Sequence, residues 1–334
     1  MSDSVLEIEG LKIEFPGMVR NVQAVRGVDL TLDRGELVGL VGESGSGKSM
    51  TALACLGLVP HPGIVTGSVK ISGRSVIGRS GQELAHLRGG EAAMIFQNPT
   101  KALNPFFTVG RQMVDAIRCH RPFSKPDAEK AAIEGLRSVK MPDPAFAMEK
   151  YPHQMSGGQI QRVMIALALA CEPKLLIADE PTTALDVTIQ AQILVLLRDL
   201  AKERGLTILF ITHDLGVVAT LCDRVSVMYA GRIVETSDVE SLYSDPLHPY
   251  TQRLLATVPR RGQKLEKLPA IVGQVPNMAD PPTGCAFNPR CDKADGICRS
   301  VDPVLKPFRS GSSVACHHAV GENQSTGMTS QEIQ

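Results

Sequence analysis

The chain has no long hydrophobic run and no surplus of charge of either sign, and we expect no secretory signal. Its 35 basic and 35 acidic residues balance to a formal net charge of zero, so the composition provides no basic field that would attract nucleic acid. The longest strongly apolar stretch, residues 163–170, is far short of the roughly 20 residues that a membrane span requires. Residues 1–4 contain neither a basic segment nor an apolar core. We therefore expect a cytoplasmic chain that can still dock onto a membrane protein.

Segments of strand character alternate with segments of helical spacing, which predicts an α/β fold with a mostly parallel sheet covered on both faces. From residue 98 to about 165 helical spacing dominates, which indicates an inserted helical layer. Beyond residue 260 periodicity fades and prolines gather. We expect a core domain over 1–260 with a helical subdomain at about 98–165, a loop-rich extension over 261–320, and a disordered tail over 321–334. The strands that we expect cover residues 6–15, 22–32 with a turn at Gly27, 36–41, 68–72, 92–96, 174–178, 207–212 and 224–229.

Residues 42–49, Gly-Glu-Ser-Gly-Ser-Gly-Lys-Ser, fit the phosphate-binding pattern GxxxxGK[ST]. A buried strand precedes the motif and a helix follows it, which is the context that such a loop needs. Its backbone N–H groups can point at phosphate oxygens at the start of the helix. Lys48 can reach the β- and γ-phosphates, and the Ser49 hydroxyl can ligate Mg²⁺. The predicted phosphate-binding residues are Gly42, Ser44, Gly45, Gly47, Lys48 and Ser49.

Two carboxylates, Asp179 and Glu180, end the apolar strand at 175–179. From that position Asp179 can hold Mg²⁺ directly or through water, and Glu180 can polarise an attacking water. Gln97 and His213 end two other expected strands. The carboxyl ends of parallel strands share the edge where ligands bind, so we expect all four side chains near the phosphate loop. Gln97, Glu180, His213 and Lys48 are the candidate catalytic residues, and Ser49, Gln97 and Asp179 are the candidate ligands of Mg²⁺.

A second surface for phosphate lies at residues 156–159, which open an apolar helix. The N–H groups at the start of this helix would attract a γ-phosphate. A serine N-cap with glycines in a turn explains Ser156, but it does not explain why Gly-Gly-Gln at 157–159 is followed by Gln161 and Arg162. A chain with two phosphate-binding surfaces can share a nucleotide with a partner.

These motifs, in this order, resemble the ATP-binding cassette (ABC) family of transport ATPases over roughly residues 5–260. Residues 42–49 correspond to its Walker A, Gln97 to its Q-loop and residues 156–159 to its signature, where Met155 stands in the usual place of leucine. Asp179 corresponds to the end of Walker B, residues 184–186 to the D-loop and His213 to the switch histidine. Phe15 lies where the family often stacks an aromatic ring on adenine, although a packed strand phenylalanine is an alternative.

The resemblance implies a P-loop ABC ATPase core, with a mostly parallel sheet and an antiparallel β subdomain, that binds ATP and Mg²⁺. It also implies a head-to-tail dimer in which each ATP lies between the phosphate loop of one subunit and the signature of the other. ATP would close the dimer and hydrolysis would reopen it, which moves attached membrane permeases.

Residues 96–99 and 102–105, together with residues 248–255, resemble the dipeptide and oligopeptide importers, a branch with nickel and glutathione relatives. That likeness implies a second ATPase subunit (a paralogue or a second copy), two permease subunits and, indirectly, a solute-binding protein. The chain would then act at the cytoplasmic face of the bacterial inner membrane. A soluble ABC ATPase of DNA repair or translation is the alternative, but those proteins commonly carry two cassettes or a long coiled coil.

Four of the eight cysteines lie in the last 50 residues: Cys285, Cys291, Cys298 and Cys316. Four gathered thiols in a cytoplasmic protein indicate zinc or an iron–sulfur cluster rather than disulfides. The C-x₂-C pairs typical of zinc ribbons are missing, which favours iron–sulfur. The resemblance adds weight, because importer ATPases of this branch can carry a 4Fe–4S cluster in their extension. Unligated thiols are the alternative.

Overall fold

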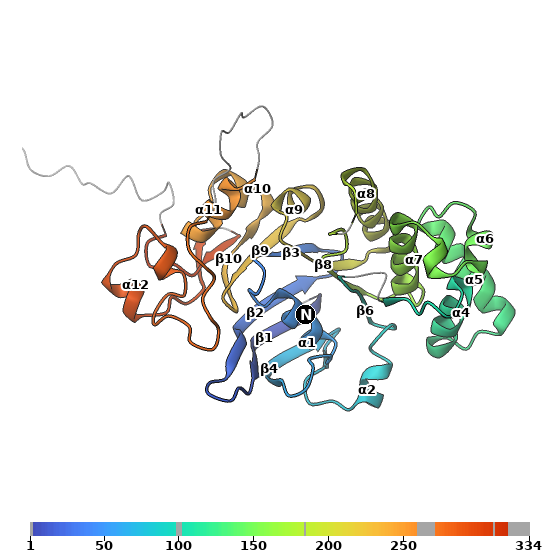
Figure 1. Cartoon of the computed structure of the whole chain (residues 1–334), viewed down its shortest axis with the longest axis horizontal. Helices are drawn as coiled ribbons and strands as arrows, with labels where there is room; N and C mark the ends of the chain where they lie inside the picture. The colour runs from blue at the N-terminus through green and yellow to red at the C-terminus, as the bar shows by residue number, and fades with distance from the viewer. Residues whose placement is uncertain (1–2, 98–101, 184, 259–270, 310, 320–334) are drawn as a thin grey trace, which may run out of the picture.

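A large, mostly parallel sheet positions the predicted nucleotide-site residues. The computed structural model describes residues 3–97, 102–183, 185–258, 271–309 and 311–319. Within them the sheet has the strand order β11-β12-β10-β9-β3-β8-β7-β6, and its strands from β9 to β6 run parallel (Figure 1). The parallel strands are β3 (Leu37–Val41), β6 (Ala92–Ile95), β7 (Leu175–Asp179), β8 (Thr207–Thr212) and β9 (Arg224–Tyr229). They are almost entirely buried, as expected of strands covered on both faces.

A second, antiparallel sheet has the order β2-β1-β4-β5. Its strands are β1 (Ser4–Phe15), β2 (Val22–Asp33), β4 (Ile64–Ile71) and β5 (Arg74–Ser75). The sequence suggested a turn at Gly27, but β2 continues through it. The register against β1 slips by one residue there, since Leu11 pairs with Val28 and Lys12 with Arg26. Gly27 adopts φ +99, which a glycine accommodates in a bulge without breaking the strand.

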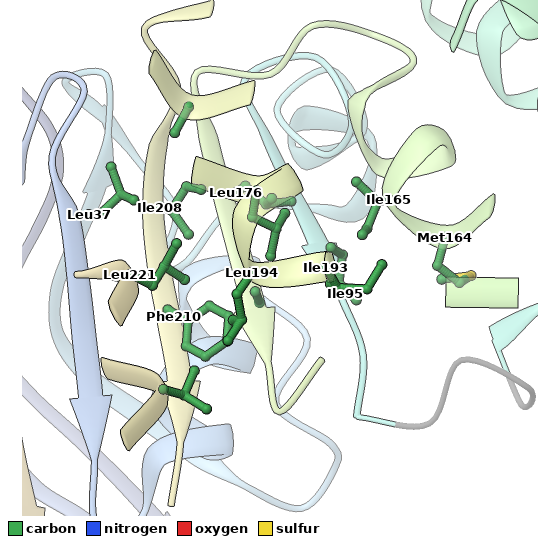
Figure 2. Packing of buried hydrophobic residues seen from close by; sticks show 14 of the residues in the cluster. Leu37, Ile95, Met164, Ile165, Leu176, Ile193, Leu194, Ile208, Phe210 and Leu221 are labelled. Carbon is green, nitrogen blue, oxygen red and sulfur yellow. The ribbon is translucent and has the colours of Figure 1, made fainter. Parts of the chain in front are cut away.

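The large sheet separates two hydrophobic clusters. Ile208 and Phe210 of β8 face one cluster, whereas Leu209 and Ile211 of the same strand face the other, because successive side chains of a strand point to opposite faces. Figure 2 shows Phe210 beside the aliphatic side chains of the covering helices. Those helices are α7 (Gly157–Leu169), α8 (Val187–Arg204) and α9 (Leu215–Leu221), and the antiparallel sheet and α1 (Lys48–Cys55) cover the opposite face. The predicted α/β fold class is therefore confirmed.

Between β6 and β7 the chain forms a helical layer beside the sheet (Figure 1). Side-chain caps at Thr108, Ser124 and Asp143 start its first helices, each accepting a hydrogen bond from a backbone N–H of the first turn. The layer comprises α4 (Val109–His120), α5 (Lys125–Ser138), α6 (Pro144–Glu149), the 3₁₀ turn η1 (Pro152–Gln154) and α7. Residues 98–101, where we expected it to begin, lie outside the described residues.

The carboxyl-terminal part of the chain joins the large sheet. β12 (Ser312–Val314) pairs with β10 (Arg232–Asp238), and β11 (Lys306–Arg309) extends that edge. The expected boundary at 260/261 and the tail at 321–334 fall outside the described residues. The remaining elements among the described residues are α2 (Gly81–Ala85), α10 (Val239–Ser244), α11 (Pro249–Ala256), η2 (Asn288–Arg290) and α12 (Gly296–Ser300). Among the described helices, none combines the length and the hydropathy needed to cross a membrane.

Candidate nucleotide-binding site

The phosphate loop connects β3 to α1 through backbone that only glycine tolerates at two positions. A Cβ on Gly42 would lie 2.1 Å from the carbonyl oxygen of Met228. A Cβ on Gly47, whose φ is +106, would lie 2.5 Å from the carbonyl oxygen of Ala24. Ser44 and Gly45 form the exposed tip of the loop. The close approach of β9 and β2 therefore requires glycine at both positions, as in loops that bind phosphate through their backbone.

Lys48 is held against the loop that it belongs to. Its Nζ donates hydrogen bonds to the carbonyl oxygens of Gly42 at 2.7 Å and Glu43 at 2.9 Å. The side chain is only 5% exposed, and this burial lowers the pKa of Lys48, although the carboxylates of Glu180 and Asp179 oppose the shift. The ammonium group is therefore held by the backbone of the phosphate loop.

Asp179 and Ser49 link the two sides of the site. The Ser49 hydroxyl, at the start of α1, donates to Oδ1 of Asp179 at 3.2 Å, at the end of β7. Asp179 is 5% exposed, and burial raises its pKa. A hydroxyl and a buried carboxylate at this distance are the oxygen ligands that Mg²⁺ prefers.

Three strand ends converge on Glu180. Gln97 Nε2, after β6, donates to Glu180 Oε2 at 2.9 Å, and His213 Nδ1, after β8, lies 3.0 Å from Oε1. Thr183, to which the sequence analysis assigned no role, also donates to Oε2 at 3.0 Å. Burial alone would raise the pKa of Glu180, but the bonds from His213, Thr183 and Gln97 outweigh it, so the pKa is lowered. The carboxylate is therefore ionised and fixed in orientation.

Residues 156–159 begin α7 with a capping box. Gln159 N–H donates to Ser156 Oγ at 3.4 Å, and Ser156 N–H donates to Gln159 Oε1 at 3.0 Å. Gln159 thus has a local role that the sequence analysis did not assign. A Cβ on Gly158 would lie 2.9 Å from Ile189 of α8, so close helix packing accounts for that glycine. Within the described ranges, hydrogen bonds do not connect residues 156–159 with the phosphate loop.

Two other predicted positions have local structural roles. Phe15 ends β1 half-buried, and a Cβ on Gly63 would come 2.9 Å from its ring. Asp186 caps α8 by accepting a hydrogen bond from the N–H of Ile189 at 2.9 Å. Residue 184, the first of the predicted D-loop, lies outside the described residues.

The four carboxyl-terminal cysteines line one cavity, together with His248 and residues 317–318. The N–H of Cys285 donates to the carbonyl oxygen of Cys298 at 2.8 Å, which ties two of them together. Burial, reinforced by the neighbouring cysteines, raises the pKa of Cys285 to about 11. Among the described residues, the ligand atoms of Asp295, Cys298 and His318 form a group within 4.8 Å of one another, whereas three cysteine sulfurs do not form such a group.

The phosphate loop also has neighbours that the sequence analysis missed. The N–H of Glu43 donates to the Tyr250 hydroxyl at 2.9 Å, and the Glu43 carboxylate pairs with Arg290. No spacing pattern signals these contacts, because 247 positions separate Glu43 from Arg290.

The buried lysine, the Ser49–Asp179 pair and the converging strand ends are the features of a P-loop ATPase.

Comparison with known proteins identifies the class further. The family described as "ABC transporter" matches residues 25–183, and the "Oligopeptide/dipeptide transporter, C-terminal region" matches residues 234–298. The chain is 48% identical to the probable peptide ABC transporter ATP-binding protein y4tR of Sinorhizobium fredii, over 94% of this chain and 95% of the relative. It is 44% identical to the dipeptide transport ATP-binding protein DppD of Escherichia coli, over 96% of this chain and 98% of the relative.

A solved structure agrees with these relatives. The dimeric post-hydrolysis state of the ATP-binding cassette MJ0796, bound to ADP and Pi, is 29% identical with a TM-score of 0.62. The similarity covers 70% of this chain and 98% of the MJ0796 chain. The present chain therefore belongs to the ABC transporter family, as its motifs suggested. It is an ATP-hydrolysing subunit of that family.

Proposed function

We propose that the chain is the energy-coupling ATPase of a bacterial importer for dipeptides or oligopeptides, acting at the cytoplasmic face of the inner membrane. The observation that carries this proposal is the match of residues 234–298 to the oligopeptide/dipeptide transporter carboxyl-terminal region. Relatives named as peptide-transport ATP-binding proteins span nearly the whole chain, which supports the same cargo class. Its partners would be a second ABC ATPase subunit, two permeases and, through them, a solute-binding protein.

In this proposal the hydrolytic water is activated by Glu180. The lowered pKa of Glu180 keeps it ionised, and contacts from Gln97, Thr183 and His213 hold it in one orientation, as a general base requires. Lys48 and the backbone N–H groups of the phosphate-binding residues predicted above would bind the β- and γ-phosphates. Bound Mg²⁺ would supply charge neutralisation between those phosphates, with Ser49, Asp179 and Gln97 as its candidate protein ligands.

The second half of each site would come from the partner subunit. The phosphate loop lies before α1, whereas residues 156–159 begin α7, which packs against α4, α5 and β6. The first N–H groups of α7, at Gly157 and Gly158, suit a γ-phosphate presented by another subunit. The dimeric MJ0796 cassette supports a dimer as the working unit. Phe15 would stack on adenine.

Uptake in cells tests the cargo. Deleting the gene should abolish accumulation of radiolabelled dipeptides or tripeptides, and expression of the intact chain should restore it. The matched control is Glu180→Gln, which should leave the protein level unchanged and fail to restore uptake. If peptide uptake persisted after the deletion and nickel or glutathione uptake were lost instead, the peptide assignment would be contradicted. The assignment as an importer ATPase would still stand.

We further infer that Cys285, Cys291, Cys298 and Cys316 hold a 4Fe–4S cluster. All four line one cavity, and each could bind the cluster as a thiolate, whose negative charge the iron would compensate. A single zinc ion, with Zn–S bonds of about 2.3 Å, would gather four sulfurs within about 4 Å. Zinc sites built from cysteines usually carry C-x₂-C pairs, which this chain lacks, and this favours the cluster.

Absorption spectroscopy and metal analysis test the cluster. Protein purified without oxygen should be brown, with a broad visible band, and should contain about four irons per chain. Replacing Cys291 by serine should remove the band, whereas replacing Cys119, which is exposed on the helical layer, should not. Colourless protein with one zinc per chain would reverse the assignment.

A further inference from the structure

Arg290 of the carboxyl-terminal extension is buried beneath the phosphate loop with every N–H donor satisfied. Its side chain is only 3% exposed. Arginine has five N–H donors in a rigid fork, and here each meets an acceptor. The acceptors are Glu43 Oε2 at 2.8 Å, Glu43 Oε1 at 3.1 Å, the Tyr229 hydroxyl at 3.3 Å, and the carbonyl oxygens of Val272 at 3.1 Å and Ile271 at 3.3 Å. The guanidinium therefore has one well-defined position.

The partner of this arginine, Glu43, is the second residue of the phosphate loop. Two parallel hydrogen bonds hold both carboxylate oxygens, the strongest geometry for an arginine–carboxylate pair. The Tyr250 hydroxyl accepts a hydrogen bond from the N–H of Glu43, so the main chain of Glu43 is fixed as well. The rings of Tyr229, Tyr250 and Phe287 support the pair, with centroids 4.6 to 5.5 Å apart.

A carboxylate in a loop that binds a triphosphate weakens binding, because both groups are negatively charged. The negative charge of Glu43 acts on the Lys48 ammonium: burial lowers the pKa of Lys48, and the charge of Glu43 opposes this by raising it. It would likewise repel the phosphates that Lys48 binds. A bidentate arginine cancels the charge and keeps the carboxylate turned toward the extension.

We propose that Arg290 is a positioning residue of the ATP site, which acts by neutralising Glu43 and holding its carboxylate away from the bound phosphates. The carboxyl-terminal extension is then part of the machinery that binds ATP, in addition to any role of its cysteines. Arg290 lies in η2, directly before Cys291, so the segment from Cys285 to Cys291 supplies both Phe287 and Arg290 to the base of the loop. The proposal requires ATPase activity alone and does not depend on the cargo or on the cluster.

Opposite effects of two substitutions that break the same pair test the proposal. Arg290→Met leaves an unpaired negative charge beside the phosphates, and we expect it to weaken MgADP binding to the full chain at least about tenfold, or about 1.4 kcal/mol. Glu43→Gln removes that charge, so its MgADP affinity should equal or exceed that of the parent. The double variant should recover most of the affinity lost in Arg290→Met. Isothermal titration calorimetry measures each dissociation constant.

Arg309→Met is the matched control. Arg309 pairs with Asp245 and connects the extension to the core without touching the phosphate loop. It should lower the melting temperature and change the MgADP dissociation constant less than twofold. If Arg290→Met does not fold, Arg290→Lys keeps the charge without the fork and should weaken MgADP binding less than tenfold, with a loss that shrinks as salt increases.

Two results would overturn the proposal. One is equal weakening of MgADP binding by Glu43→Gln and Arg290→Met, which would mean that the pair serves only to attach the extension. The other is a folded Arg290→Met variant, shown by circular dichroism, that binds MgADP within twofold of the parent.

Discussion

Replacing Glu180 by glutamine separates the chemistry of this site from its stability. Glutamine can reproduce the local hydrogen bonds, because its Oε1 can accept from Gln97 Nε2 and Thr183 Oγ1 while its Nε2 donates to His213 Nδ1. The histidine only has to adopt the tautomer that leaves Nδ1 unprotonated. We therefore expect the free energy of unfolding to change by less than about 1 kcal/mol.

The same substitution should largely abolish ATP hydrolysis. An amide cannot accept the proton of the attacking water, and a positioned general base contributes roughly 10²- to 10⁴-fold to a rate. Turnover should fall by that factor, measured as phosphate release at saturating MgATP, while ATP binding is kept and a dimer with trapped ATP accumulates on size-exclusion chromatography. Turnover within threefold of the parent in a fully folded variant would refute the assignment of Glu180 as the base.

Three further substitutions test other parts of the structure. Ser156→Ala removes the cap of α7, so it should lower the free energy of unfolding by about 1 kcal/mol, and it should also abolish turnover while ADP binding is unchanged. The control Ser124→Ala removes an equivalent cap and should leave turnover intact. Equal turnover in the two variants would argue against a shared site. Thr183→Val leaves the burial that raises the pKa of Glu180 but removes one hydrogen bond that lowers it, so this pKa should rise. Glu180 would then be protonated, and activity lost, at a higher pH as the solution is acidified. An unshifted acidic limb of the pH–rate profile would contradict this. Phe210→Ala leaves a cavity at a fully buried position between β8 and α8 (Figure 2). It should lower the free energy of unfolding, measured by urea denaturation, by about 3–5 kcal/mol. A loss below about 1 kcal/mol would show that the core collapses into the cavity.

Contacts among residues near in sequence were the most predictable. The glycines and lysine of residues 42–49, the strand ending at Asp179 and the helix beginning at Ser156 follow from short patterns with a direct chemical meaning. The bulge at Gly27 was misread as a turn, because a glycine in a strand serves either purpose until the partner strand is known. The capping box of Gln159 had a readable signal, a glutamine three residues after a serine, which was attributed to phosphate instead.

The sequence by itself determined the class of chemistry, because phosphate binding and carboxylate placement depend on residue type at fixed short spacing. Only the tertiary structure revealed that Thr183 completes the contacts of Glu180 and that Arg290 neutralises Glu43. It also showed that β11 and β12 extend the large sheet. These features join segments up to 247 positions apart, and such pairings depend on how the whole chain buries its apolar faces rather than on any local pattern.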